Sequence, residues 1–253
     1  MSTSSPATPS RRKVLRGATF GALAVGVGAL TGPLLTTPAQ AYSWGGTLRV
    51  GSSGAAVQEL QIRVAGWAAS SASQVYVAVD GVFGNGTAGA VQRFQSAYGL
   101  AADGIAGPAT QAALNALEKG DGSTAHFAWS EMWEPATGNF AGGAVSAAAA
   151  QENCRRLMYK LEALRVKLGN LPIHINSAFR NVQDNTNSGG IPNSMHLYGA
   201  AADMYVSGVP NRTIYQKAET CGFSGLERYT INHQHVDSQA EFGRNWWWES
   251  GVV

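Results

Sequence analysis

The sequence predicts an α+β protein, in which a small three-helix domain is followed by an α+β domain with a mixed or antiparallel sheet. Three observations support this fold class. A short motif repeats after 23 residues in the first half, a long helical pattern follows it, and strand-like segments come last. The helices and strands lack the regular alternation of a parallel α/β sheet, which favours the α+β class. The length of 253 residues is sufficient for two domains.

Residues 1–41 precede both domains and have the features of an export signal. Four basic residues lie between positions 11 and 16, ahead of an apolar stretch over about residues 18–35 and the tripeptide Ala39-Gln40-Ala41. A basic start, an apolar run and an A-x-A site indicate a signal peptide, and the pair Arg11-Arg12 points to the twin-arginine route. Glycine and threonine dilute the apolar run, so we predict cleavage after Ala41; an uncleaved membrane anchor is the alternative.

The charge balance excludes one class of function. The formal net charge is +2, but the leader holds four basic residues and no acidic one, so the remaining chain has 14 basic and 16 acidic residues and a net charge of −2. A near-neutral protein lacks the basic surface that binds nucleic acid. We therefore expect no nucleic-acid partner. The export signal predicts a secreted protein with no stable membrane association after cleavage, and we expect that protein to be a monomer.

An internal repeat organises the first domain. Residues 80–84 read DGVFG and residues 103–107 read DGIAG. Each copy is typical of an Asp-Gly turn followed by a helix, and Pro108 suits the first helical position of the second copy. Together with an earlier helix, the two copies predict a three-helix unit over about residues 47–117. Apolar residues at helical spacing support it: Val57, Leu60, Val64, Ala90, Val91, Phe94 and Tyr98.

These residues resemble the peptidoglycan-binding domain 1 family. The similar segments read VQELQ from Val57, DGVFGNGTAGAVQRFQ from Asp80 and GLAADGIAGPAT from Gly99. The resemblance implies that residues 42–117 form a helical module that docks on bacterial peptidoglycan, so that the protein is associated with the cell wall. Residues 63–76 follow the family pattern less closely. We expect the binding surface between the repeats.

The amino-acid composition and the hydrophobic pattern change at the start of the second domain. Residues 118–125 are polar and rich in glycine, which predicts a linker, and residues 126–253 follow as the second domain. Residues 144–168 predict a long helix with leucines along one stripe, ended by Gly169. Three later segments read as strands: residues 173–179, 203–206 and 231–236.

Both cysteines, Cys154 and Cys221, belong to this second domain. In an exported protein an even number of cysteines favours a disulfide, whereas in the cytosol the same residues would be buried thiols. We predict a Cys154–Cys221 bridge.

A possible metal site is indicated by the histidines of the second domain. His196 and Asp203 are seven positions apart and are joined by small residues. His233 and His235 are two apart, so on a strand their side chains share one face. Three nitrogen or oxygen ligands with an open fourth position are typical of catalytic zinc. Taken alone, a histidine pair on a strand is more often a hydrogen-bonded pair, so the pattern needs further support.

That support comes from a resemblance to the zinc D-Ala-D-Ala carboxypeptidases, a superfamily that includes lysostaphin-type endopeptidases and the hedgehog signalling domain. The similar segments read SAFR at residues 177–180, SMHLYGAAAD at residues 194–203 and HQH at residues 233–235. The resemblance covers about residues 124–253. It implies a zinc metallopeptidase in which a metal-activated water hydrolyses peptidoglycan stem peptides that end in D-Ala-D-Ala.

The resemblance also assigns site residues. It implies that His196, Asp203 and His235 bind one zinc ion, that His233 is the catalytic histidine beside it, and that Arg180 contacts substrate. A guanidinium fork suits a terminal carboxylate; a structural ion pair is the alternative for Arg180. Some branches of the family carry a glutamate three residues before the last ligand. This chain has Asn232 there, which excludes a glutamate base at this position, so His233 is considered as the base instead.

Other polar and aromatic residues leave alternatives open. Asp237 either orients a ligand imidazole or is a solvated residue at a strand end. Trp246, Trp247 and Trp248 either line a groove or pack in the core. His126 and His174 are expected to make local hydrogen bonds.

Two other functions remain open at this point. One is an L-alanyl-D-glutamate or cross-link endopeptidase of the endolysin type. The other is a non-catalytic wall-binding protein whose zinc is structural.

Overall fold

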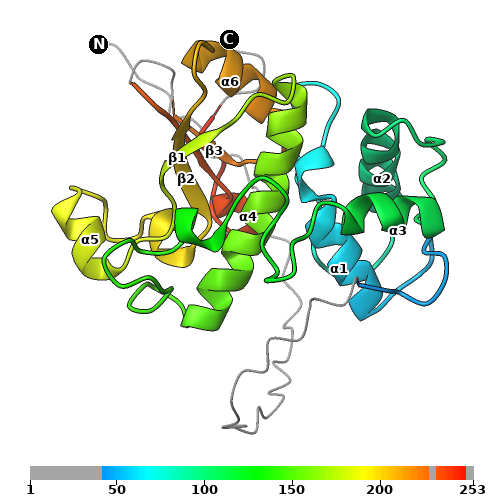
Figure 1. Ribbon diagram of the computed structural model, residues 1–253, viewed down its shortest axis with the longest axis horizontal. Coiled ribbons are helices and arrows are strands. Elements are labelled where there is room, and N and C mark those ends of the chain that lie inside the picture. Colours follow the sequence, from blue (N-terminus) through cyan, green and yellow to red (C-terminus); the bar gives the residue numbers. More distant parts are fainter. Residues whose placement is uncertain (1–41, 228–231, 249–253) are drawn as a thin grey trace, which may run out of the picture. The chain divides into compact units, whose positions relative to one another are not determined.

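The computed structural model describes residues 42–227 and 232–248 (Figure 1). The predicted signal peptide and its cleavage site lie outside the described residues. The α-helices are α1 (Ala55–Arg63), α2 (Asn85–Ala97), α3 (Pro108–Asn115), α4 (Ala147–Lys167), α5 (Val182–Asn187) and α6 (Asn211–Ala218). The strands are β1 (His174–Ser177), β2 (Ala201–Tyr205), β3 (Gly225–Leu226) and β4 (Gln234–Asp237).

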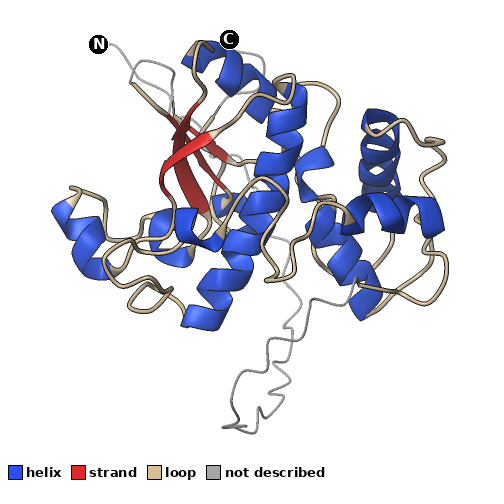
Figure 2. Cartoon of the chain, in the orientation of Figure 1, coloured by secondary structure: helices blue, strands red, loops and turns tan. Residues whose placement is uncertain are grey.

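The four strands form a single sheet in the order β1-β2-β4-β3, and every pair in it is antiparallel (Figure 2). The predicted α+β class is therefore confirmed, with an antiparallel rather than a mixed sheet. The observed strands are shorter than or shifted from the predicted segments, and residue 231 of the last one lies outside the described part of the chain. Strand β3 was not predicted, because two residues are too short for a period-2 pattern.

Helix α4 begins and ends close to its predicted limits. The side chain of Ser146 caps its first turn by accepting the N–H of Ala149 at 3.3 Å. At its C-terminus Gly169 adopts φ 77°, the left-handed conformation that commonly ends a helix. The predicted leucine stripe is buried in the core of the sheet domain, together with residues from β2 and β4. The helix covers the sheet in Figure 1.

The opposite side of α4 belongs to the core of the helical module. Tyr159 and Ala163 are buried there against Trp67 and the apolar residues of α1 and α2. The contact is close because residue 66 is glycine. A Cβ atom on Gly66 would lie 2.5 Å from the Cβ of Ala163. One helix thus serves the cores of both domains.

In the module, the repeat extends to a buried glutamine that closes each Asp-Gly turn. Gln95 Nε2 donates to Asp103 Oδ1 at 2.9 Å and to the Ile105 carbonyl at 3.0 Å, and its Oε1 accepts the Gly104 N–H at 2.9 Å. Gln61 makes the equivalent bonds to the first turn. Both glutamines are almost fully buried. Each side chain satisfies several turn groups that would otherwise be buried without partners.

The predicted linker is a closed turn. Lys119 N–H donates to the Ser123 carbonyl at 2.8 Å, and residues Glu118 and Thr124 pair as an isolated antiparallel bridge. Ser123 and Thr124 are fully buried. The polar, glycine-rich composition of this segment therefore reflects turn geometry. The exact domain limits at residues 117 and 126 remain predictions.

The predicted Cys154–Cys221 disulfide is wrong, because both residues are buried free thiols. Cys221 Sγ lies 3.5 Å from Lys167 Nζ, at the C-terminal end of α4. Cys154 precedes Lys167 by 13 positions on the same helix, or about 20 Å along its axis. A disulfide requires Cα atoms closer than about 7 Å. Burial raises the pKa of the Cys154 thiol. Sequence spacing carries no information about this separation.

Between residues 42 and 248, apart from the undescribed 228–231, no helix has the length and apolarity needed to cross a membrane.

The glutamine-closed turns yield a stability prediction. Replacing Gln95 by alanine leaves the Gly104 N–H and the Ile105 carbonyl without their partner, so we expect the free energy of unfolding to fall by about 3 kcal/mol. Urea denaturation measures the change. The matched control is Gln92→Ala on the exposed side of the same helix, for which we expect a change within about 0.5 kcal/mol. Equal effects of the two substitutions would contradict this account.

Candidate metal centre and active site

The register of the sheet brings two predicted ligands together. Asp203 on β2 is paired directly with His235 on β4. Directly opposed residues in an antiparallel pair point to the same face with their Cβ atoms about 5 Å apart. His235 Nδ1 lies 2.7 Å from Asp203 Oδ1. Backbone pairing alone thus places a carboxylate and an imidazole in contact.

The third predicted ligand comes from a short 3₁₀ helix, η3 (Met195–Tyr198), that leads into β2. Ser194 caps this turn and accepts the N–H of His196 at 3.4 Å. His196 Nδ1 lies 2.5 Å from the Ala178 carbonyl, so Nε2 faces the site, 3.4 Å from Asp203 Oδ2. Within the described residues, one ligand atom from each of His196, Asp203 and His235 lies within 4.8 Å of the other two.

Gly199 explains the spacing between His196 and Asp203. It ends η3 with φ 69°, a left-handed conformation that favours glycine. A Cβ atom at this position would lie 2.4 Å from the carbonyl oxygen of Ala150 and 2.9 Å from Cys154 Sγ. The turn therefore presses against α4 with no room for a side chain, and this contact sets where His196 lies.

The electrostatics of the cluster favour a cation. Burial alone would raise the pKa of Asp203, but the hydrogen bonds and charges of His196 and His235 outweigh it and hold that pKa well below its usual range. Burial likewise opposes protonation of His235, yet Asp203 and Asp237 raise the pKa of His235 to about 9. For His196, burial dominates and lowers the pKa. Two buried carboxylates thus stabilise positive charge between them.

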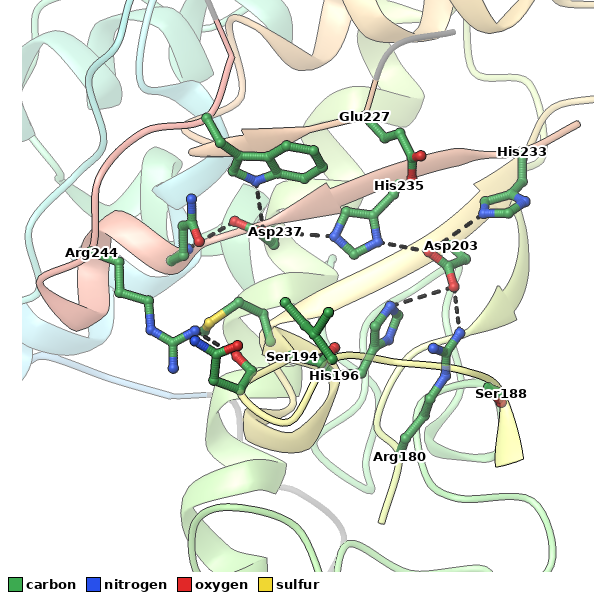
Figure 3. Close-up of a pocket in the computed structure, with 15 residues that line it drawn as sticks. Arg180, Ser188, Ser194, His196, Asp203, Glu227, His233, His235, Asp237 and Arg244 are labelled. Carbon is green, nitrogen blue, oxygen red and sulfur yellow. Dashed lines mark hydrogen bonds and ion pairs between the residues drawn. The ribbon is translucent and has the colours of Figure 1, made fainter. Parts of the chain in front are cut away.

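The two predicted catalytic residues surround the same aspartate (Figure 3). His233 Nε2 lies 3.8 Å from Asp203 Oδ1, and this side chain is 35% exposed. Arg180 Nη2 donates to Asp203 Oδ2 at 2.5 Å, and its Nε donates to Ser177 Oγ at 2.7 Å. The ion pair considered for Arg180 is therefore present, and its partner is a predicted metal ligand. All five predicted site residues converge on one point.

The remaining alternatives are resolved by contacts. Asp237 is buried and lies behind His235, with Oδ2 3.6 Å from His235 Nε2. Trp248 packs in the core, whereas Trp247 is 45% exposed and lines the cleft. His126 pairs with Glu162 at 2.8 Å. His174 is stacked on Tyr205. Neither of these two histidines joins the site.

A cleft of about 560 Å³ opens over the cluster. Its lining includes two charged residues that were not predicted, Glu227 and Arg244. Arg244 Nη1 donates to the Asn193 carbonyl at 2.6 Å, and its guanidinium lies 5.0 Å from the Tyr198 ring. Glu227 donates its N–H to the His235 carbonyl at 3.2 Å. Neither residue belongs to a local motif, so only the strand register and the chain path after β4 reveal them.

The donor set fits a metal of the zinc type. Two imidazole nitrogens and one carboxylate are ligands that zinc accepts in tetrahedral catalytic sites. The carbonyl that fixes His196 Nδ1 and the carboxylate behind His235 Nε2 are the outer partners that metal-binding histidines usually have. The cluster therefore defines a candidate metal-dependent hydrolase.

Comparison with known proteins agrees with this class. Residues 125–237 match the family described as Peptidase M15, and residues 53–114 match the putative peptidoglycan binding domain. The chain is 42% identical over 230 residues to the zinc D-Ala-D-Ala carboxypeptidase of Streptomyces albus G, covering 87% of this chain and 89% of that protein. The chain therefore belongs to the peptidase M15 family and carries a peptidoglycan-binding domain, as the resemblances predicted.

The role of Gly199 can be tested against a glycine of the same conformation. Gly199→Ala should lower the free energy of unfolding by at least about 2 kcal/mol, because the left-handed backbone and the overlap with α4 both disfavour a Cβ. It should also weaken metal binding, since η3 carries His196. Gly189 has φ 69° with open space around it, so Gly189→Ala should cost about 1 kcal/mol and leave metal binding unchanged. Thermal unfolding and metal titration measure both, and equal losses would contradict the proposed contact.

Proposed function

We propose that this protein is a secreted zinc D-Ala-D-Ala carboxypeptidase that removes the terminal D-Ala from peptidoglycan stem peptides. The observation that carries the proposal is the buried His196–Asp203–His235 cluster at the base of an open cleft. The 42% identity to a zinc D-Ala-D-Ala carboxypeptidase over most of both chains supports it.

His196, Asp203 and His235 hold the zinc ion in this proposal. Zinc supplies Lewis acidity, which polarises a peptide carbonyl and lowers the pKa of water towards roughly 7. The protein contributes the orientation of the three ligands. Asp203 is held by Arg180, and each histidine by a partner at its outer nitrogen. Such support keeps the ligand geometry ready before substrate binds.

His233 moves a proton in this proposal. Its imidazole lies beside the cluster and is 35% exposed, so it reaches both the site and the cleft. Imidazole exchanges protons near neutral pH, and a positioned acid–base group contributes about 10²–10⁴ to a rate. Asn232 carries no acid–base group, and His235 is assigned to the metal, so the proposal gives the proton transfer to His233.

Arg180 binds the substrate while it supports Asp203. Among the described residues, hydrogen bonds to Asp203 and Ser177 use two of its five N–H donors. The planar guanidinium then offers further donors to a peptide carboxylate or to a carbonyl that gains negative charge. The structural ion pair and the substrate contact are compatible roles for this residue.

The helical module directs the enzyme to its substrate. In this proposal the signal peptide is removed after Ala41, the module of residues 42–117 binds peptidoglycan, and residues 126–253 act on the stem peptides of the wall. The match of residues 53–114 to the putative peptidoglycan binding domain supports this division.

Product analysis separates the proposal from an L-alanyl-D-glutamate or cross-link endopeptidase. The purified mature protein is incubated with a defined stem pentapeptide that ends in D-Ala-D-Ala, and the products are identified by mass. We expect loss of one terminal D-Ala, abolition of activity by a chelator, and recovery on addition of zinc. Cleavage at an internal bond alone, or no cleavage by the zinc-loaded protein, would overturn the proposed activity.

Substitution of the two cleft residues tests catalysis against a purely structural zinc. His233→Ala and Arg180→Ala should each lower kcat/KM for the pentapeptide at least about 100-fold, while zinc content measured by metal analysis stays near one per chain. His174→Ala is the control, because His174 is an exposed residue of the outer strand β1 and is stacked on Tyr205, away from the site. Unchanged hydrolysis by the cleft variants would contradict the assigned roles.

A further inference from the structure

We propose that Trp247 is a positioning residue of the metal site, which fixes the Asp237 carboxylate and through it the orientation of the His235 imidazole. The inference rests on the proposed zinc site. It concerns the segment that follows β4, for which the sequence left open whether its tryptophans line a groove or pack in the core.

Both oxygens of Asp237 have defined partners. Trp247 Nε1 donates to Asp237 Oδ2 at 2.9 Å, and the Gln239 N–H donates to Asp237 Oδ1 at 2.9 Å. The carboxylate is buried at 4% exposure. A buried carboxylate with two fixed donors has one orientation, and that orientation directs Oδ2 toward His235 Nε2, 3.6 Å away.

This contact selects which nitrogen of His235 faces Asp203 and the other predicted ligand. An imidazole can rotate about its χ2 angle and present either nitrogen, and the partner of the outer nitrogen selects the state. Here the outer nitrogen is Nε2, facing Asp237, and Nδ1 points to Asp203 at 2.7 Å. Figure 3 shows the imidazole between the two carboxylates, with Asp203 on the side of the other ligands.

The indole reaches Asp237 because residue 225 is glycine. Gly225 on β3 is paired with Asp237 on β4. A Cβ atom on Gly225 would lie 1.6 Å from Trp247 Nε1 and 2.2 Å from Asp237 Oδ2. The backbone N–H of Trp247 donates to the Ser224 carbonyl at 3.1 Å, which ties the segment to the residue that precedes β3. The indole N–H of Trp247 and the carboxylate of Asp237 therefore occupy the space that a side chain at residue 225 would need.

The neighbouring tryptophans have different roles. Trp248 Nε1 donates to the Phe223 carbonyl at 2.9 Å within the core. Trp246 is partly buried and packs against Trp248, with ring centroids 5.7 Å apart. Trp247 has a different environment, because the residue is 45% exposed while its indole N–H donates to the buried Asp237. A role in packing alone does not account for that combination.

The test is zinc affinity, measured by competition with a chromophoric chelator. Trp247→Phe keeps an aromatic ring at this position and removes the N–H donor together with part of the indole, so we expect the zinc dissociation constant to rise about tenfold or more. Trp246→Phe is the matched control and should leave it unchanged. The melting temperature of the metal-free protein is measured for each variant, and we expect Trp247→Phe to match the wild type, since a folding defect would lower it.

A second variant disrupts the Trp247–Asp237 hydrogen bond without changing either of its two residues. Gly225→Ala should displace the indole from Asp237 and raise the zinc dissociation constant in the same direction. An unchanged zinc affinity in Trp247→Phe would overturn the inference, even if the wild-type protein binds zinc and removes D-Ala. Failure of the wild-type protein to bind zinc would instead contradict the proposed function, so the two failures are distinguishable.

Discussion

The pairing of Asp203 on β2 with His235 on β4 is the constraint on which the rest of the site depends. A slip of one residue in this register would turn one of the two side chains to the opposite face of the sheet. On the other side of β2, the register with β1 shifts between Ile175 and Ser177, so that Ser177 lies opposite Asp203. This irregularity lets Ser177 accept the Arg180 N–H beside the cluster. Strands β1, β2 and β4 thus together position the carboxylate of Asp203 and its neighbours.

Helix α4 supplies the rigid surface behind this arrangement. Its Ala150 carbonyl contacts the Gly199 turn that carries His196, and its opposite side packs against Gly66 of the helical module. Farther along, the buried Lys160 donates to the Gly222 carbonyl at 2.8 Å and to Ser238 Oγ at 2.7 Å. Since Ser238 follows Asp237 directly, α4 also fixes the start of the segment that returns to the site. The active site and the module are therefore supported by one element.

Much of the site could be predicted because its chemistry is carried by residue identity. Histidine, aspartate and arginine at the spacings of a known family are informative wherever they fold, and the sequence could place His196, Asp203, His233 and His235 in one site. The repeat of the helical module could likewise be predicted from its two Asp-Gly turns. The buried Gln61 and Gln95 were not recognised as part of it, because they stand at unequal distances from the turns that they close.

The sequence by itself determined the fold class, the two domains and the types of ligand, because these follow from local patterns and from side-chain chemistry. The tertiary structure decided what depends on separation in space. It set Cys154 and Cys221 apart as free thiols, brought Arg180 onto Asp203, and returned Trp247 to Asp237 across the space left by Gly225. Such contacts join residues far apart in the chain, and only the packing of strands against α4 and against each other determines which of them meet.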